Sequence, residues 1–428
     1  MSAPASRPWI PPAALITGQL AHGASWLLLM AFAWPSTPGL SMPGLAWIHA
    51  VALGWLTLTA LGVMVHVIPG FLDIEWIAEG VARWSLLPFA LGVLLLVAGF
   101  ALTAPIALSG GAVLILLGLL GFAGPALATV LSFKPPAGTK APFRFSFTLV
   151  LGALGVAAAL GATMAWALAG APWGQVLGWL PPIHAVLAGG GWLTLLIIGV
   201  STRTLFPVTG RRRADHKLRF HVWVSSGLTL GFVLLLVGLL PGVAHPAWRW
   251  AGLAALAIAA VLYAIDGAEL VIGAPNDHKP PIAFVSMTLI YLVATVLIGL
   301  GVNAGHPEWQ AALAFVGLIG WMGQSVNGYL MHIGIRLLTT VVRGDDDETR
   351  PGQLLVPWLS WTAFVATQAA VVGGTALLLL GLGHYLPWVG ACGLVGWVAL
   401  MVNVRMAYLK ARKWPQDPEI PLMVLPLS

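Results

Sequence analysis

Long apolar stretches alternate with short polar segments along almost all of the 428 residues. Apolar runs of about 20 residues, long enough to cross a bilayer as a helix, begin near residues 13, 44, 84, 106, 145, 180, 220, 247, 281, 309, 355 and 386. The pattern predicts an all-α polytopic membrane protein with twelve transmembrane helices in one domain. It shows no β-barrel alternation, so we expect a bacterial-type cytoplasmic (inner) membrane.

Composition agrees with this class, since 59% of the residues are hydrophobic and only 8% are charged. Soluble domains carry about 25% charged residues. The 21 tryptophans and 51 glycines are typical of interfacial anchoring and close helix packing in membranes. The single cysteine, Cys392, excludes an internal disulfide and any four-cysteine zinc or iron–sulfur site within the chain.

The formal charge of +6 could suggest a nucleic-acid partner, but the basic residues are placed by topology. If the twelve spans alternate in direction, nineteen of the twenty lysines and arginines fall on one side and Arg249 alone falls on the other. Positive residues favour the cytoplasmic side. We therefore expect both termini in the cytoplasm, the lipid bilayer as the main partner, and no nucleic acid.

Three segments repeat a Gly-Trp pair, with six residues separating each tryptophan from a second glycine: Gly54-Trp55 to Gly62, Gly191-Trp192 to Gly199, and Gly320-Trp321 to Gly328. The tryptophans lie 137 and 129 residues apart, which is about four helices. The sequence thus predicts three pseudo-repeated four-helix units, roughly 1–80 with 355–428, 81–210 and 211–345. The repeats fall on spans 2, 6 and 10, which run in the same direction and imply a rotation axis along the membrane normal.

Five of the eleven histidines fall within or at the ends of predicted spans, and a buried imidazole in hydrocarbon is costly unless it has a partner. They are His22, His49, His66, His184 and His332. Neutral imidazole is a good ligand for heme iron and for copper. We place His278 in a cytoplasmic loop.

Depth sorts these residues into layers. His49 and His184 precede their tryptophans by six and eight residues and form an outer pair, which we predict to hold heme or another metal. His66, Arg203 and His332 each follow a tryptophan by eleven residues and form an inner layer, while His22 lies near the middle of the first span.

Each of these residues also has an ordinary structural interpretation. The outer histidines could be interfacial groups that hydrogen-bond to a neighbouring helix, and Arg203 could anchor to lipid phosphate. Asp266 and Glu269, one turn apart near the inner end of the eighth span, could admit protons or be a solvated pair.

The chain resembles subunit I of the heme–copper oxidases, and more closely their small single-subunit relatives and the NnrS family of heme- and copper-containing membrane proteins. The resemblance is carried by His49-Ala-Val-Ala-Leu-Gly-Trp through His66-Val-Ile-Pro, by His184-Ala-Val with the segment 199–211, and by Gly328-Tyr-Leu-Met-His-Ile. It implies that His49 corresponds to a low-spin heme b ligand on the second helix. His184 corresponds to the helix 6 histidine that ligates copper in the oxidases.

The oxidases have further histidine ligands near the outer ends of helices 7 and 10. The corresponding segments here hold no ligand: they read Leu-Leu-Leu-Val-Gly-Leu-Leu at 234–240 and Ala-Leu-Ala-Phe-Val-Gly-Leu at 312–318. The usual binuclear oxygen-reducing centre is therefore incomplete. Val51 stands where the NnrS pattern has a second histidine.

Three hypotheses follow. The first is a heme protein, with or without copper, that transfers electrons between quinol and a respiratory partner or handles nitric oxide or a similar small molecule, and so could be an oxidoreductase. The second is a heme-free transporter or metal-delivery protein in which Arg203, Asp266 and Glu269 gate a cytoplasmic exit. The third is an assembly subunit whose polar residues serve helix packing. The substrate and any homo-oligomer stay open.

Overall fold

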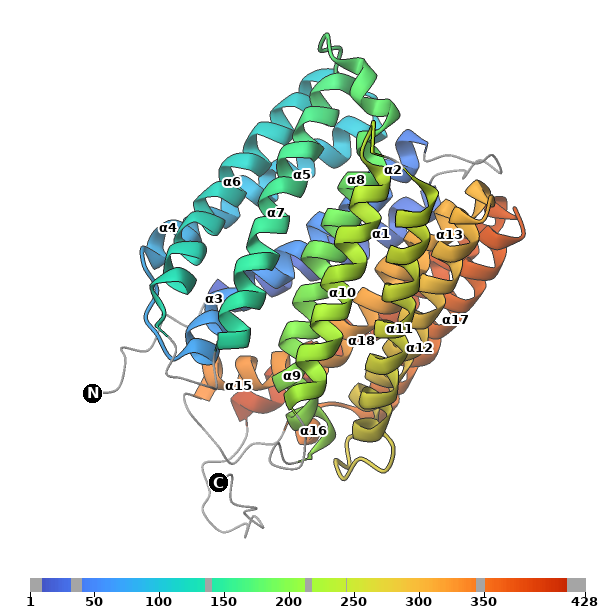
Figure 1. Cartoon of the computed structure of the whole chain (residues 1–428). Helices are drawn as coiled ribbons and strands as arrows, with labels where there is room; N and C mark the ends of the chain where they lie inside the picture. Colours follow the sequence, from blue (N-terminus) through green and yellow to red (C-terminus); the bar gives the residue numbers. More distant parts are fainter. Residues whose placement is uncertain are drawn as a thin grey trace.

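The computed structural model describes residues 10–31, 41–134, 141–211, 218–243, 245–343 and 351–413, and all regular structure in these ranges is helical (Figure 1). The two termini lie outside these ranges. So do Arg7, Lys140, Arg212, Arg213, Lys217 and Arg350, on which the predicted topology partly rests.

Three long helices carry the Gly-Trp repeats. The first Gly-Trp helix comprises α2 (Met42–His49), η1 (Ala50–Thr57) and α3 (Leu58–Leu72). The second comprises α8 (Leu180–Ala185), η3 (Val186–Thr194) and α9 (Leu195–Thr209). The third comprises α13 (Gln310–Phe315), η6 (Val316–Gly323), α14 (Gln324–Tyr329), η7 (Leu330–Gly334) and α15 (Ile335–Arg343).

The other helices surround these three. They are α1 (Ile10–Ala31), α4 (Glu79–Trp84), α5 (Leu86–Ala101), α6 (Pro105–Ser132), α7 (Ala141–Leu168), η2 (Gly174–Gly178), α10 (Leu218–Leu239), α11 (Pro246–Val271), α12 (Lys279–Asn303), η5 (Pro307–Trp309), α16 (Pro351–Leu354), α17 (Pro357–Leu379), η8 (Gly383–Tyr385) and α18 (Leu386–Lys413).

Ten helices within the described ranges are long and apolar enough to cross a membrane, against the twelve spans predicted from sequence. Neither α10 nor the third Gly-Trp helix is among the ten. The apolar part of α10, Val224–Leu239, is shorter than the other apolar helices. Gln324, Ser325 and Asn327 interrupt the apolar sequence of the third Gly-Trp helix, which explains its weaker signal.

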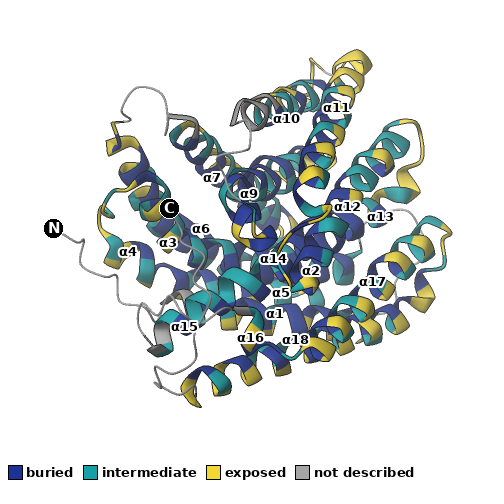
Figure 2. Cartoon of the chain, turned by 90° about the horizontal axis from the view of Figure 1, so that it is seen from below, coloured by how far each residue is buried: buried dark blue, intermediate teal, exposed yellow. Residues whose placement is uncertain are grey.

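Large apolar side chains cover the outer faces of the bundle. Ile106, Leu102 and Trp388, for example, are 90%, 73% and 73% exposed. Soluble proteins do not expose this much apolar surface, whereas a lipid-facing helix does. Figure 2 shows the complementary arrangement, with buried residues around α9 and α14 and exposed residues on the outer helices. The chain is therefore a multi-span membrane protein in contact with lipid.

A π-helical segment covers the Gly-Trp pair in each of the three Gly-Trp helices: η1 at Trp55, η3 at Trp192 and η6 at Trp321. A π-segment widens the helix by an extra residue per turn and occurs often at functional sites. The glycine of each pair lets a neighbouring helix approach closely. A Cβ at Gly54, Gly191 or Gly320 would lie 3.0, 2.8 or 2.9 Å from α1, α7 or α12, respectively.

The three tryptophans are buried where the Gly-Trp helices meet. The indole Nε1 of Trp192 donates to Oγ1 of Thr57 at 3.0 Å, and Nε1 of Trp321 donates to Oγ1 of Thr194 at 3.1 Å. Each threonine lies two residues after the tryptophan of its own helix. These contacts join the first helix to the second and the second to the third, and Trp55 packs on Gly323 of the third.

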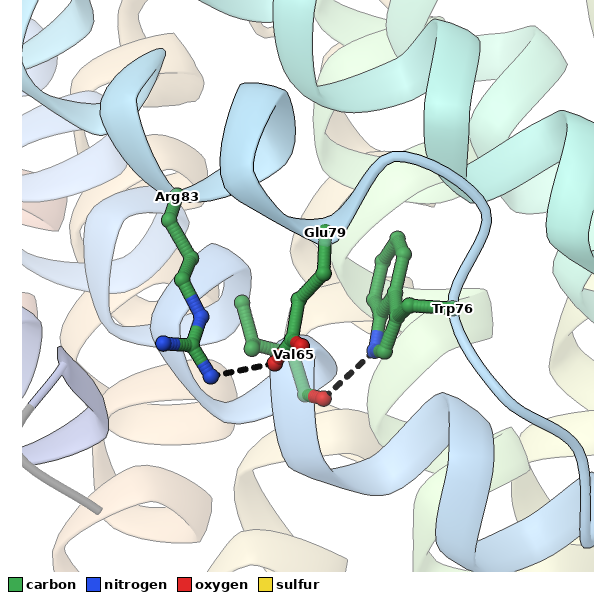
Figure 3. A network of polar contacts seen from close by, with 4 residues as sticks. All are labelled: Val65, Trp76, Glu79 and Arg83. Carbon is green, nitrogen blue, oxygen red and sulfur yellow. Dashed lines mark hydrogen bonds and ion pairs between the residues drawn. The ribbon is translucent and has the colours of Figure 1, made fainter. Parts of the chain in front are cut away.

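The C-terminal end of the first Gly-Trp helix is fixed by a tryptophan from the following turn. Pro69 has no N–H, so the carbonyl of Val65 loses its partner within the helix. The indole Nε1 of Trp76 donates to that carbonyl at 2.7 Å (Figure 3). Beside it, Arg83 and Glu79 pair on α4. The bend after Leu72 is thus held by a side chain that replaces a missing backbone hydrogen bond.

Replacing Trp76 by phenylalanine tests this bond. Trp76→Phe keeps an aromatic ring near Phe122 but leaves the Val65 carbonyl without its donor, which costs about 1–3 kcal/mol. We expect a lower melting temperature for the detergent-solubilised protein. Trp84, which is 69% exposed, supplies the matched control Trp84→Phe. Equal melting temperatures for the two variants would show that the bond contributes nothing to stability.

Candidate functional site

His49 and His184, the outer pair predicted from sequence, lie beside each other in the structure. His49 is the last residue of α2, immediately before η1, and His184 lies two residues before η3. Their ring centroids are 6.5 Å apart and the ring planes differ by 18°. Nearby positions in two repeats, six and eight residues before their tryptophans, thus bring two imidazoles from different helices to one site.

Main-chain carbonyls fix the orientation and tautomer of both rings. Nδ1 of His49 donates to the carbonyl of Leu45 at 2.7 Å, and Nδ1 of His184 donates to the carbonyl of Ala157 on α7 at 2.9 Å. A carbonyl only accepts, so Nδ1 carries the hydrogen and each neutral ring keeps its lone pair on Nε2. No hydrogen bond to either Nε2 is found within the described residues. Metal-binding histidines are held in this way.

Two further residues shape the space around the imidazoles. The ring of Phe100 on α5 stacks on His49, with centroids 4.8 Å apart. Gly161 on α7 faces His184, and a Cβ there would lie 3.0 Å from Cε1 of the imidazole. An aromatic wall and a side-chain-free position therefore flank the pair.

The spacing suits two imidazoles around one metal ion. Metal–nitrogen bonds of about 2.0 Å on opposite sides of an ion place the two ring centroids about 6 Å apart. Within the described ranges no group of three histidine, cysteine, aspartate or glutamate side chains could hold a metal ion. In ligand type, ligand number and centroid spacing, the pair is compatible with a heme iron or with a two-coordinate copper(I) ion.

His22 has a different environment. Its Nε2 accepts from Nε1 of Trp26 at 3.0 Å, and its Nδ1 lies 3.2 Å from Oε1 of Gln19. Its ring also stacks on Trp55, with centroids 3.4 Å apart and planes differing by 4°. Both nitrogens are occupied by protein groups, so these contacts favour a structural role for His22 over ligation.

The contacts found among the described residues do not join the residues of the inner layer, His66, Arg203 and His332, into a single site. His66 is exposed on α3. The guanidinium of Arg203 lies 4.6 Å from the ring centroids of both Phe71 and Phe143, as a cation between two aromatic faces. Nδ1 of His332 is buried without a hydrogen-bond partner.

The neighbour of His332 is His278, which we had placed in a cytoplasmic loop. His278 immediately precedes α12, and it lies close enough to His332 to act on it electrostatically, as does Arg336. Both ring nitrogens of His278 are buried without a hydrogen-bond partner, and Gly352 packs against the ring. No local sequence signal joins residues 278, 332 and 352, because their proximity depends on how the third Gly-Trp helix packs on α12.

His278 makes the fold sensitive to acid. Burial lowers the pKa of His278 from 6.5 to about 4, because it disfavours the charged ring. Between these values the unfolded chain binds the proton and the folded chain does not, so stability falls as pH drops from 6.5 toward 4. We expect His278→Asn to reduce the loss of melting temperature between pH 7 and pH 5. The control is His384→Asn, at an exposed residue, and the same reduction in both would contradict this assignment.

Asp266 and Glu269 face different surroundings although they lie one turn apart. Asp266 is 7% exposed and lies near Tyr263, whereas Glu269 is exposed. Next to them, Oγ of Ser201 and Oη of Tyr329 are 2.5 Å apart and join the second and third Gly-Trp helices. Asp266 is therefore part of a buried polar group of residues.

The sequence was also compared with known proteins. No protein-family model matches the chain, and no curated protein matches it either.

Proposed function

We propose that the protein binds heme b between His49 and His184 and transfers electrons within the membrane. One observation carries the proposal: two imidazoles with Nδ1 held by carbonyls have ring centroids 6.5 Å apart, and no third histidine, cysteine, aspartate or glutamate joins them among the described residues. Porphyrin needs two axial ligands only. A metal ion bound by side chains alone usually needs three or more.

The number of axial ligands decides between the redox roles considered from sequence. His49 and His184 would hold the heme, and with both histidines bound to the iron it would supply one-electron exchange rather than a site for nitric oxide or oxygen. The carbonyls of Leu45 and Ala157 keep the Nε2 lone pairs available, and Phe100 covers one side of His49. The proposal therefore favours an electron carrier, with quinol or a membrane-bound respiratory partner as the source or acceptor of electrons.

We also propose twelve spans, with α10 and the third Gly-Trp helix crossing the membrane beside the ten apolar helices. Support comes from the contacts of the Gly-Trp helices, which pack through equivalent tryptophans and glycines. Because His49 and His184 lie near the N-terminal ends of helices that run in the same direction, they share one depth. Under the positive-inside rule that depth is near the outer face.

The same observation, two imidazoles without a third ligand among the described residues, also favours a second function. Copper(I) accepts two imidazoles with no further ligand. The same pair could then hold copper in transit, as in a heme-free metal-delivery protein.

Absorption spectra and metal analysis on one sample distinguish the two functions. The protein is purified in mild detergent from cells supplied with a heme precursor, and spectra are recorded before and after dithionite. Sharp α and Soret bands with about one iron per chain support heme between two histidines. A colourless protein with one copper per chain would transfer the assignment to metal delivery, and a sample with neither would contradict both.

A further inference from the structure

The contacts among the three Gly-Trp helices are interrupted at one place. Thr57 and Thr194 each accept a hydrogen bond from the tryptophan of the next helix, but the equivalent residue of the third helix is Gly323. A Cβ there would lie 2.8 Å from Cη2 of Trp55. The benzene edge of Trp55 therefore packs against the third helix, and its Nε1 is buried with no hydrogen-bond partner.

Four more buried polar atoms near Trp55 also have no partner. They are Nε2 of Gln19, Oγ1 of Thr59, Nε2 of Gln324 and Oδ1 of Asn327. Their residues are 4%, 5%, 0% and 2% exposed, respectively. Unpaired polar atoms are rare in protein interiors, because each costs the desolvation free energy that a hydrogen bond would recover.

Helix geometry places these residues within about one helical turn of the same depth. We name this group the Trp55 layer: Gln19, Trp55, Thr59, Gln324 and Asn327. Gly18 of α1 packs on the Thr59 side chain, so Gln19 and Thr59 lie at one depth. Thr59 is one turn beyond Trp55 on its helix. Gln324 follows Gly323, the residue that the edge of the Trp55 ring contacts, and Asn327 is one turn further along.

Two chains of side-chain hydrogen bonds end at this layer. In the first, Oη of Tyr291 donates to Oε1 of Gln368 at 2.7 Å, and Nε2 of Gln368 donates to Oε1 of Gln324 at 3.0 Å. In the second, His22 accepts from Trp26 and lies 3.2 Å from Oε1 of Gln19. Each chain ends in an amide nitrogen without a partner.

We propose that the Trp55 layer binds ordered water, which joins the two chains into one hydrogen-bonded path from Tyr291 to His22. The layer offers three N–H donors, one amide oxygen and one hydroxyl, and no charged side chain belongs to it. A metal cation does not fit a site rich in donors, and an anion would need a cationic partner. Water donates and accepts, and about two molecules satisfy five such atoms at about three hydrogen bonds each. The inference does not depend on the proposed heme.

Radiolytic labelling by hydroxyl radicals tests the proposal, because radicals formed from bound water oxidise the side chains beside it. The chain contains its own controls: Trp55, Trp192 and Trp321 are 0%, 2% and 1% exposed, and the latter two donate to threonine. The purified protein is irradiated and the oxidation of each tryptophan is followed by mass spectrometry. We expect Trp55 to be oxidised several-fold faster than the other two. Equal rates for all three would overturn the proposal.

A pair of variants links the labelling to the layer. Gln324→Leu removes two polar atoms of the layer, so we expect slower oxidation of Trp55 with unchanged rates at Trp192 and Trp321, which also report that the fold is intact. Ser325→Ala is the control, because the hydroxyl of Ser325 donates to the carbonyl of Trp321 within its own helix. Unchanged oxidation of Trp55 in Gln324→Leu, or an equal decrease in Ser325→Ala, would contradict the proposal.

Discussion

His49→Ala and His184→Ala are each expected to reduce the heme content of the purified protein by about tenfold or more, since each removes one of two axial ligands. The physical reason is that the described residues near the pair provide no third metal ligand to replace the lost imidazole. The heme-to-protein ratio follows from the absorption of a pyridine extract and the protein concentration.

Controls separate loss of a ligand from loss of the fold. His66→Ala changes an exposed histidine on α3 and should leave the heme content unchanged. Gly161→Val keeps both imidazoles but places a side chain against His184, because a Cβ there would lie 3.0 Å from Cε1. We expect it to weaken heme retention without abolishing it. Full heme content in either alanine variant, with a monodisperse sample, would show that the pair is not the ligand set.

Gly111→Val is expected to cause the largest loss of stability, because α5 and α6 touch backbone to backbone at this residue. A Cβ at Gly111 would lie 2.6 Å from N of Leu96 and 2.9 Å from O of Gly92. Backbone atoms cannot rotate away, so the helices must separate. Overpacking costs about 1–3 kcal/mol where side chains can adjust, and more where they cannot. Close contact through small residues is what holds membrane helices together.

The neighbouring glycine supplies a matched control. The nearest atom to a Cβ at Gly110 is Cδ1 of Leu95, at 4.0 Å. Gly110→Val therefore adds the same side chain to the same helix with ordinary contact. The measurements are the melting temperature and the yield of monodisperse protein in detergent. Similar values for the two variants would show that the α5–α6 contact is looser than the structure indicates.

The sequence predicted the class of fold and the outer pair because both depend on local or repeated patterns. Apolar runs mark membrane helices one at a time. The Gly-Trp repeat set His49 and His184 at similar depth on helices expected to be equivalent, so their proximity followed from the repeat. The third Gly-Trp helix was found through its repeat although Gln324, Ser325 and Asn327 weaken its apolar signal.

Other features depend on packing between distant segments and could not be predicted. The π-segments at the Gly-Trp pairs lie in the middle of continuous helices. A Gly-Trp pair accompanies each of these three segments but does not by itself specify a π-helical winding. The partners of His22 include Trp55, which a single span cannot reveal. His278 and His332 are neighbours only because the start of α12 packs against the third Gly-Trp helix. Gly323 could be recognised as the exception among the repeats only once Thr57 and Thr194 were seen to accept hydrogen bonds.

Electron paramagnetic resonance of the oxidised, purified protein tests the central claim most directly. Iron held by His49 and His184 should give the low-spin ferric signal of two axial imidazoles, and this signal should disappear in both His49→Ala and His184→Ala. A high-spin ferric signal in the unmodified protein would mean that one axial position is open. A low-spin signal that persists in either variant would mean that other residues hold the heme. Either result would contradict the account.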